Sequence, residues 1–442
     1  MKKLFLFLIV SVWLFLLVSC TPSAVTSEER RTTVPCVTVE VPVTTEVSVT
    51  TVKETAFLTP EEIAANPYAA AGLELTLTVC RQYYDLTADV LATNLEDRNI
   101  ATVWPLTAYI EMLAEAHRLY PDHPSVKKYY RKALEYCLSD YLVEDVTIRS
   151  ASGEFYHHML YYNAGANRAG DYYYDDNAWI AIRLIDAYRQ LDEKKYLELA
   201  EGILSFLWTG WDTQKGGIFW DRHLAKKGIC TNGSACVAYL MAYEVTQNEI
   251  YLERAKEIYA WCNRMLKSRG GLYHADLLDV TASSFSEENL HPFIASYDQG
   301  TMMTASSLFY RITNDRTYYE ELKMTAQSTI GLMFRNEDAM KGNPIFKSWG
   351  VGWAVRGEMN AYAAGCTGSS ARFMQYFDSI LNQLLTTKDE NGHYDPYFMT
   401  GEWWPPEDQP DVDRYDSDVM QPAGVATAFL LTAQYQLYQN KG

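Results

Sequence analysis

The chain has 442 residues with a formal net charge of −18 at pH 7, and 14% of its residues are aromatic. A protein this acidic is a poor partner for nucleic acid or polyanionic substrates, because like charges repel, whereas a neutral ligand is compatible with it. A chain of this length can also bury an adequate core without disulfides.

The N-terminus has the pattern of a secretory signal. Two lysines precede an apolar run from Leu4 to Val18, which is too short to span a bilayer comfortably. The run ends in Leu17-Val18-Ser19-Cys20, which resembles a bacterial lipobox, where cleavage before the cysteine is followed by lipidation. We therefore expect residues 1–19 to be a signal peptide and Cys20 to carry the lipid. The product would be an exported lipoprotein, expected at the periplasmic or cell-surface face of the outer membrane, touching the membrane through its anchor alone.

Composition divides the rest of the chain into two parts. Residues 20–56 are rich in Thr, Val and Ser with few aromatics, which predicts a tether. From 57 to 442, apolar residues recur at helical spacing, which predicts one large all-α domain. We expect helices at 104–120, 126–142, 176–191, 195–208, 232–246, 251–266, 299–312, 318–334, 369–385 and 419–438. Strand patterns are few and short, for example Gly217–Trp220.

An internal repeat lies within the helical part. Three copies of a helix, a short turn and a second helix begin near Asp176, Thr231 and Asp298. Repeated hairpins predict either an open solenoid or a closed ring. At matching positions near the start of each first helix stand Asn177, Asn232 and Gln299. Such amides often cap helices, but three in register favour a shared cleft where they could bind sugar hydroxyls.

The string Tyr172-Tyr173-Tyr174-Asp175-Asp176-Asn177-Ala178-Trp179 is the strongest candidate for chemistry. A helix N-terminus explains one aspartate, because the helix dipole favours an acid there. It explains an adjacent pair poorly, because neighbouring carboxylates repel. Glycoside hydrolysis requires two carboxyl groups, and a shared site can separate their pKa values. Asp175 and Asp176 are therefore the predicted catalytic residues.

The segment Tyr174 to Trp179 resembles the signature of glycoside hydrolase family 76, the endo-α-1,6-mannanases. The resemblance continues in order through Gly216–Trp220, Thr231–Ala235, Gly271–Asp276, Tyr297–Thr301 and Ile345–Gly357. It implies a single-domain (α/α)6 barrel and a retaining hydrolase of internal α-1,6 bonds in mannan, a neutral polysaccharide. It further implies Asp175 as nucleophile and Asp176 as general acid/base, with no metal or organic cofactor. The candidate sugar-binding residues are Tyr174, Asn177, Trp220, Asn232, Tyr297, Asp298 and Gln299, with Trp349 and Trp353 as further aromatic candidates.

Other patterns predict no separate site. The seven cysteines after Cys20 are scattered, which indicates buried small apolar residues and no zinc motif. His157 and His158 lack companion ligands, and the acidic run Asp411–Asp418 lacks the glycine and closing glutamate of a helix–loop–helix calcium site. Three alternatives stay open from the sequence: transglycosylation, hydrolysis of another α-glycan on the same barrel, and a non-catalytic glycan-binding lipoprotein.

Overall fold

The computed structural model describes residues 59–96, 98–335, 338–342, 348–396 and 419–439. The chain divides into Met1–Val52 and Lys53–Gly442, and every described residue belongs to the second unit. The predicted signal peptide, Cys20, the tether and the acidic run at 411–418 lie outside the described residues.

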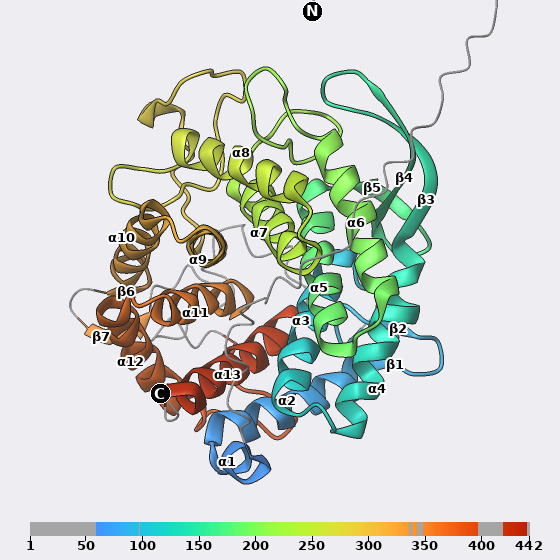
Figure 1. Ribbon diagram of the computed structural model, residues 1–442. Helices are drawn as coiled ribbons and strands as arrows, with labels where there is room; N and C mark the ends of the chain where they lie inside the picture. Colours follow the sequence, from blue (N-terminus) through green and yellow to red (C-terminus); the bar gives the residue numbers. More distant parts are fainter. Residues whose placement is uncertain (1–58, 97, 336–337, 343–347, 397–418, 440–442) are drawn as a thin grey trace, which may run out of the picture. The chain divides into compact units, whose positions relative to one another are not determined.

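Within the described residues, six helices pack in a closed ring in which each contacts the next and the last contacts the first. In ring order they are α3 (Val103–Leu119), α5 (Tyr174–Leu191), α7 (Ile229–Thr246), α9 (Ser296–Thr313), α11 (Ser348–Ala363) and α13 (Met420–Gln439). A second set packs outside them, namely α2 (Pro67–Tyr83), α4 (Pro124–Lys132), α6 (Lys194–Thr209), α8 (Glu249–Met265), α10 (Arg316–Met333) and α12 (Thr367–Leu384), after a short α1 (Pro60–Ala65). Figure 1 shows the six ring helices inside, with the even-numbered helices around them and α1 also on the outside. This arrangement is the (α/α)6 barrel, so the closed ring is confirmed over the open solenoid.

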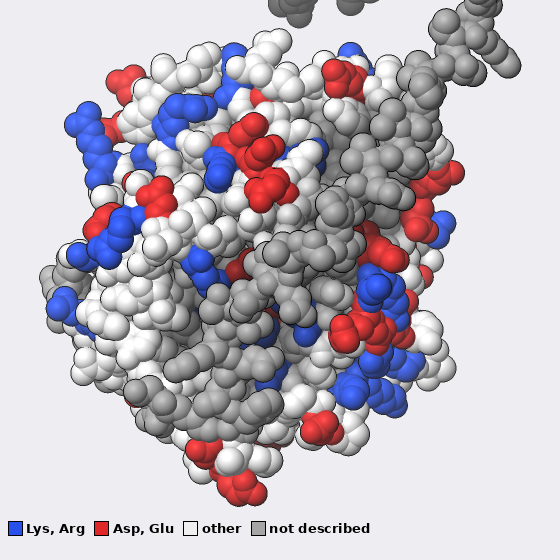
Figure 2. All heavy atoms as spheres, viewed as in Figure 1, with Lys and Arg blue, Asp and Glu red and all other residues white. Residues whose placement is uncertain are grey.

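The two rings differ in sequence because they differ in burial. The inner helix α7 is buried at every residue from Thr231 to Ala242, and α13 is buried from Pro422 to Tyr435. The outer helix α8 buries one face only. A helix enclosed on all sides reads as nearly continuous apolar sequence, whereas an outer helix is amphipathic. The outer surface is accordingly charged, and Figure 2 shows acidic and basic side chains interspersed on one face.

The predicted repeat corresponds to the hairpins α5–α6, α7–α8 and α9–α10. Each inner helix ends at a residue in the left-handed region, with φ of 54° at Asp192, 56° at Gln247 and 55° at Asn314. The backbone N–H of each caps its helix by bonding to a carbonyl four residues earlier. A left-handed residue stops a helix and reverses the chain, so the outer helix starts within a few residues.

Two glycines allow α9 and α11 to pack closely. A Cβ placed on Gly300 would lie 2.0 Å from the carbonyl oxygen of Trp353, and one on Gly357 would lie 2.9 Å from the Cα of Gly300. Neither position tolerates a side chain without moving the backbone of the other helix. The ring therefore depends on glycine at this crossing.

The structure adds short strands that the sequence pattern did not predict. The strands β3 (Leu142–Arg149), β4 (Phe155–Gly165) and β5 (Ala169–Tyr172) form an antiparallel sheet against α6, and β4 pairs with both neighbours. Two-stranded pairs join β1 (Tyr84–Asp85) to β2 (Val90–Leu91) and β6 (Phe334–Arg335) to β7 (Asp338–Gly342). The helix expected at 126–142 is corrected, because after Lys132 it passes through a π-helical turn, Ala133–Cys137, and a 3₁₀ turn, Leu138–Tyr141. A second short 3₁₀ turn spans Glu287–Asn289.

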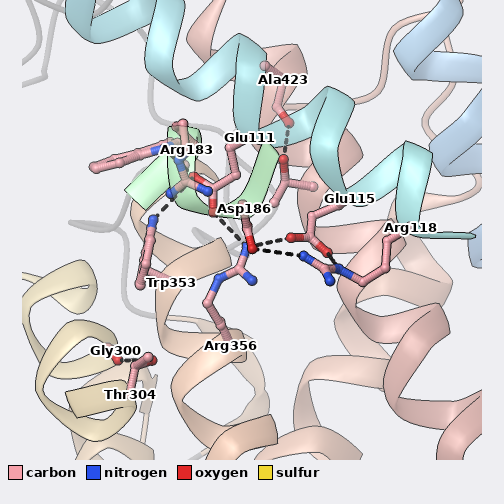
Figure 3. Close-up of polar contacts among 12 residues, drawn as sticks. Glu111, Glu115, Arg118, Arg183, Asp186, Gly300, Thr304, Trp353, Arg356 and Ala423 are labelled. Carbon is pink, nitrogen blue, oxygen red and sulfur yellow. Dashed lines mark hydrogen bonds and ion pairs between the residues drawn. The ribbon is translucent and has the colours of Figure 1, made fainter. Parts of the chain in front are cut away.

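A layer of buried ion pairs crosses the interior of the ring (Figure 3). Glu111 of α3, 1% exposed, lies 3.2 Å from Arg183 of α5 and 2.8 Å from Arg356 of α11. Arg356 also contacts Glu115 at 3.0 Å. Burial alone would raise the pKa of Glu115, but the charges of Arg356 and Arg118 and a hydrogen bond from Gln434 lower it to about 2. The layer is thus charged and internally paired.

Glu358 on α11 is a buried acid of a different kind. Among the described residues, neither of its carboxyl oxygens has a hydrogen-bond partner, and its side chain is 0% exposed. Burial raises the pKa of Glu358 from 4.5 to about 8, although the nearby Ser370 hydroxyl acts to lower it. The folded state therefore holds this proton over a pH range in which the unfolded chain has lost it.

The free energy of unfolding should consequently fall as pH rises from 4.5 through 8, because the acid is easier to ionise in the unfolded chain. The variant Glu358→Gln, which stays neutral, should be more stable than wild type at pH 9 by up to about 5 kcal/mol. The difference should shrink to a small value at pH 4. Urea unfolding at pH 4, 6 and 9 measures this, and a difference that does not depend on pH would contradict it.

The remaining scaffold features are quickly stated. The six cysteines of the described part are all unpaired thiols, and five are buried, namely Cys80, Cys137, Cys236, Cys262 and Cys366. Cys230 is partly exposed. Among the described helices, none combines the length and the apolar character that crossing a bilayer requires.

Candidate active site

The helices α5, α7 and α9 begin next to one another at one end of the ring, which we call the mouth. Their first turns carry residues in register with the repeat, Asp175-Asp176, Cys230-Thr231 and Tyr297-Asp298, each pair directly before one of the three amides. The charges of Asp175 and Asp298 both act on Cys230, so these first turns lie within electrostatic reach of one another. The repeat therefore gathers the aspartate pair and its counterparts at the mouth.

The three amides themselves do not face a substrate, which corrects the expectation for Asn177, Asn232 and Gln299. Asn232 accepts a hydrogen bond from the backbone N–H of Ile218 at 2.7 Å. Its amide nitrogen donates to the carbonyls of Ile218 and Gly228, both at 2.9 Å. All three amides are 0% exposed.

Asn177 and Gln299 repeat this pattern. Asn177 bonds to both backbone groups of Tyr162 and to the carbonyl of Tyr173. Gln299 bonds to both backbone groups of Tyr273 and to the carbonyl of Ala295. Each amide thus clamps a preceding extended segment to its own helix, and its donors and acceptor are saturated by backbone. The three amides therefore do stand at matching repeat positions, but their role is to hold backbone segments against the inner helices.

Tyr174 is also part of the scaffold and not of the mouth. It is 1% exposed, its ring stacks on Phe206 at 4.8 Å, and its hydroxyl lies 3.1 Å from the Thr209 hydroxyl. A Cβ on Gly210 would come within 2.7 Å of the ring. The expected sugar contact by Tyr174 is therefore corrected to packing between α5 and α6.

The aspartate pair stands on the first turn of α5, and both side chains are partly exposed. Burial raises the pKa of Asp175 to about 6, although hydrogen bonds from the Trp220 side chain and the Asp176 backbone and the charge of Lys226 act against the rise. Burial, reinforced by the charge of Asp175, raises the pKa of Asp176 well above its usual value. The two environments therefore favour an ionised Asp175 beside a protonated Asp176.

The segment from Trp220 to Gly228 is fastened to the start of α5 by backbone contacts. Tyr174 N–H donates to the Trp220 carbonyl, and Trp220 N–H donates to the Lys226 carbonyl, both at 2.8 Å. Tyr173 also forms an antiparallel bridge with Asp221. The Trp220 ring packs on Tyr173 with centroids 4.6 Å apart. Trp220 is thereby held against the start of α5, beside the aspartate pair.

Asp276 approaches from the segment that follows α8. Gly228 and Asp276 form a backbone bridge, and the Asp276 carboxylate lies 3.2 Å from the Lys226 ammonium. A Cβ on Gly228 would lie 2.1 Å from an Asp276 carboxyl oxygen, so glycine is needed here. Burial raises the pKa of Asp276, while Lys226 acts to lower it.

Asp298 and Tyr297 lie on the first turn of α9, on the third side of the mouth. Asp298 is 0% exposed, and neither of its carboxyl oxygens has a partner among the described residues. Burial and the charge of Asp276 raise the pKa of Asp298 well above its usual value. Tyr297 is partly exposed and packs on Trp349 with centroids 5.5 Å apart.

Beneath the mouth, a cluster of tryptophans rests on the ionic layer. Trp179 packs against both Trp349 and Trp353, at 5.3 and 4.8 Å between ring centroids. The indole N–H groups of Trp349 and Trp353 both donate to Glu111, at 3.1 and 3.2 Å. Both rings are at most 6% exposed. These two aromatic candidates therefore form the base under the site.

Three residues of the mouth were not among the predicted site residues, namely Lys226, Cys230 and Asp276. Cys230 could have been found, because it stands in the repeat position of Asp175. Asp276 lies within a segment of the family resemblance, but its distance along the chain from Asp175 gives no sign of contact. Lys226 is one of two adjacent lysines, and the other, Lys227, is buried against Asp212 at 2.7 Å. No sequence pattern separates the two.

The other candidate groups lie apart from the mouth. His158 pairs with Asp145 at 2.6 Å, and His157 lies 2.9 Å from Thr147, all on the exposed strands β3 and β4. Within the described ranges, no three His, Cys, Asp or Glu side chains are placed to hold a metal ion.

Comparison with known proteins identifies the family. A sequence model described as glycosyl hydrolase family 76 matches residues 79–392, more than half of the chain. A family 76 α-mannanase from Bacteroides thetaiotaomicron superimposes with a TM-score of 0.68 at 19% identity, covering 86% of this chain and 99% of that one. The α-1,6-mannanase of Salegentibacter sp. HEL1_6 superimposes with a TM-score of 0.64 at 17% identity, covering 84% and 99%.

Two further findings concern relatives. An inactive variant of the Salegentibacter enzyme, with two consecutive aspartates replaced by asparagine, has been solved in complex with α-1,6-mannotriose. The meiotically up-regulated gene 191 protein of Schizosaccharomyces pombe is 24% identical over 323 residues, which span 65% of this chain and 66% of that protein. With the family match extending from α2 through the mouth to α12, the chain belongs to glycosyl hydrolase family 76 and is a glycoside hydrolase on an (α/α)6 barrel.

Proposed function

We propose that this protein hydrolyses internal α-1,6-mannosidic bonds of mannan with retention of anomeric configuration. The observation that carries the proposal is the contrast between two adjacent aspartates. The Trp220 side chain, the Asp176 backbone and the Lys226 charge all act to lower the pKa of Asp175, whereas burial and the charge of Asp175 raise the pKa of Asp176. Retaining glycosidases require this division, with one carboxylate that attacks and one carboxylic acid that donates a proton.

The reaction would proceed in two displacements. In the first, the Asp175 carboxylate attacks the anomeric carbon while Asp176 protonates the glycosidic oxygen, which leaves with the rest of the chain. The product is a glycosyl ester on Asp175. In the second, Asp176, now ionised, takes a proton from water as the water oxygen attacks the same carbon, which frees Asp175. The N-terminus of α5 favours negative charge on Asp175 in the free enzyme.

The substrate class is supported by the relatives and by the side chains of the mouth. The Salegentibacter enzyme is an α-1,6-mannanase, and its variant lacking two consecutive aspartates is inactive and binds α-1,6-mannotriose. In this chain, Trp220 and Tyr297 provide aromatic surface at the mouth, and Asp298 provides unpaired oxygens. A neutral polysaccharide fits a chain with a net charge of −18.

The direct test is incubation with linear α-1,6-mannan. We expect short oligosaccharides early in the reaction, and NMR of the first products should show the α-anomer before mutarotation. A β-anomer would contradict retention. Mannan that binds without being cut would support a non-catalytic glycan-binding protein, and growth of added acceptor sugars would support transglycosylation.

The site of action is a separate proposal that rests on the sequence. We propose that the mature enzyme begins at lipidated Cys20 and remains on the outer membrane through this anchor, with residues 20–56 as the tether. Expressed in a bacterial host with labelled palmitate, wild type should take up the label and sediment with membranes. Cys20→Ala should do neither. Label on the Cys20→Ala variant would contradict the assignment.

A further inference from the structure

Lys226 lies at the mouth between an aromatic residue that packs on the start of α5 and a second acid. Its ammonium group lies 5.0 Å from the centroid of the Trp220 ring and 3.2 Å from an Asp276 carboxyl oxygen. Trp220 in turn lies against the start of α5, where its carbonyl accepts the Tyr174 N–H at 2.8 Å and its ring packs on Tyr173, and its side chain acts to lower the pKa of Asp175. The cation thus pairs with Asp276 and packs on Trp220, and its charge reaches Asp175.

The backbone fixes this position. Trp220 N–H donates to the Lys226 carbonyl, and Tyr174 N–H donates to the Trp220 carbonyl. These two bonds connect the Lys226 backbone, through Trp220, to the first turn of α5. On its other side, the bridge between Gly228 and Asp276 holds the partner acid. Lys226 therefore stays near Asp175 even though its side chain is 42% exposed.

We infer that Lys226 is a positioning residue that keeps the Asp175 carboxyl ionised, and so determines which aspartate attacks and which donates the proton. This inference rests on the proposed function. Lys226 is the cation that acts on Asp175, Asp276 and Asp298 alike. Burial favours its neutral amine, but the surrounding groups Cys230, Asp276 and Asp175 raise the pKa of Lys226, so it remains charged.

The other groups around Asp175 do not replace this charge. From α5 the neighbour is Asp176, from α7 it is Cys230, and from α9 they are Tyr297 and Asp298, with Asp276 from the segment after α8. All of these are acids or neutral groups. His291 acts on Asp276 and not on Asp175. Loss of the Lys226 charge should therefore make Asp175 harder to ionise.

The test compares kcat/KM across pH for wild type, Lys226→Gln, Lys226→Arg and Arg222→Gln. Arg222 is a matched control, because it is a cation on the same segment that pairs with Asp171 at 2.9 Å. Lys226→Gln should move the acid limb of the profile upward by about one pH unit, a modest shift because water screens an exposed side chain. Lys226→Arg should restore the wild-type limb, and Arg222→Gln should leave it in place.

A second measurement needs no substrate. Aspartate labelled with ¹³C at the carboxyl carbon lets NMR follow Asp175 directly, identified by its loss in Asp175→Asn. The Asp175 signal should titrate at higher pH in Lys226→Gln than in wild type. An unmoved titration, or an equal shift in Arg222→Gln, would overturn the inference. If the titration moves but no glycan is cut, the inference about charge holds and the proposed function fails.

Discussion

Replacing Asp175 or Asp176 by asparagine should lower kcat on α-1,6-mannan by a factor on the order of 10⁴. Without Asp175 no glycosyl ester can form, and without Asp176 the leaving oxygen receives no proton. Initial rates at saturating mannan measure the effect. Asp192→Asn is the matched control, because Asp192 ends the same helix in a left-handed conformation that asparagine readily adopts. A catalytic variant with near wild-type turnover would refute the assignment.

The Asp175→Asn variant should also be more stable than wild type at neutral pH. Burial raises the pKa of Asp175 to about 6 from 3.8, so the folded state holds the proton more tightly than the unfolded chain. Its contribution to stability is therefore lost as pH rises from 3.8 through 6. At pH 7 asparagine should restore about 2 kcal/mol, and at pH 3 the two proteins should differ little. Urea unfolding at pH 3 and pH 7 would measure whether the substitution that removes activity also raises stability at neutral pH.

Glu111→Ala should cost about 4 kcal/mol of unfolding free energy, because it leaves Arg183 and Arg356 buried without their shared carboxylate. The indoles of Trp349 and Trp353 lose their acceptor in the same change. The expected loss measures the cost of removing one partner, since a buried ion cluster need not be stabilising as a whole. Urea denaturation at pH 7 gives the value.

Glu244→Ala is the control for this prediction. Glu244 also pairs with two arginines, Arg189 at 3.0 Å and Arg311 at 2.5 Å, but these partners are 30% and 43% exposed. Water can solvate the arginines once the acid is gone, so the loss should be below about 1 kcal/mol. Equal losses of unfolding free energy in the two variants would show that burial of the ion pairs around Glu111 does not increase the cost of removing their shared acid.

The helices that bury a single face were predictable, because their buried apolar residues recur at regular spacing in the sequence. The expected helix at 195–208 matches α6 (Lys194–Thr209) within one residue at each end, because its single buried face repeats every three to four residues. The strands were not predicted, because β3 and β4 are partly exposed and their burial does not alternate cleanly. The helix α11 was not predicted as a helix either. The sequence of this segment was singled out only because it resembles the family.

The site was predictable in part. The pair Asp175-Asp176 is visible in the sequence because adjacent carboxylates at a helix start are unusual. The amides of Asn177, Asn232 and Gln299 were placed in register correctly but given the wrong role, because an amide that binds backbone and one that binds sugar look alike in sequence. Lys226 and Asp276 are brought together by the backbone bridge between Gly228 and Asp276, and contacts of this kind leave no local pattern in the sequence.

The amide clamps have a consequence for how this barrel can diversify. Each amide bonds to main-chain atoms, at Tyr162, Ile218 and Tyr273, so a different side chain at any of these three positions would leave the hydrogen bonds in place. Trp220 follows one of these residues by two positions and Asp276 follows another by three. Side chains that select a ligand can therefore change on these segments while the amide hydrogen bonds continue to hold the backbone. Specificity can evolve in this way without a cost to folding.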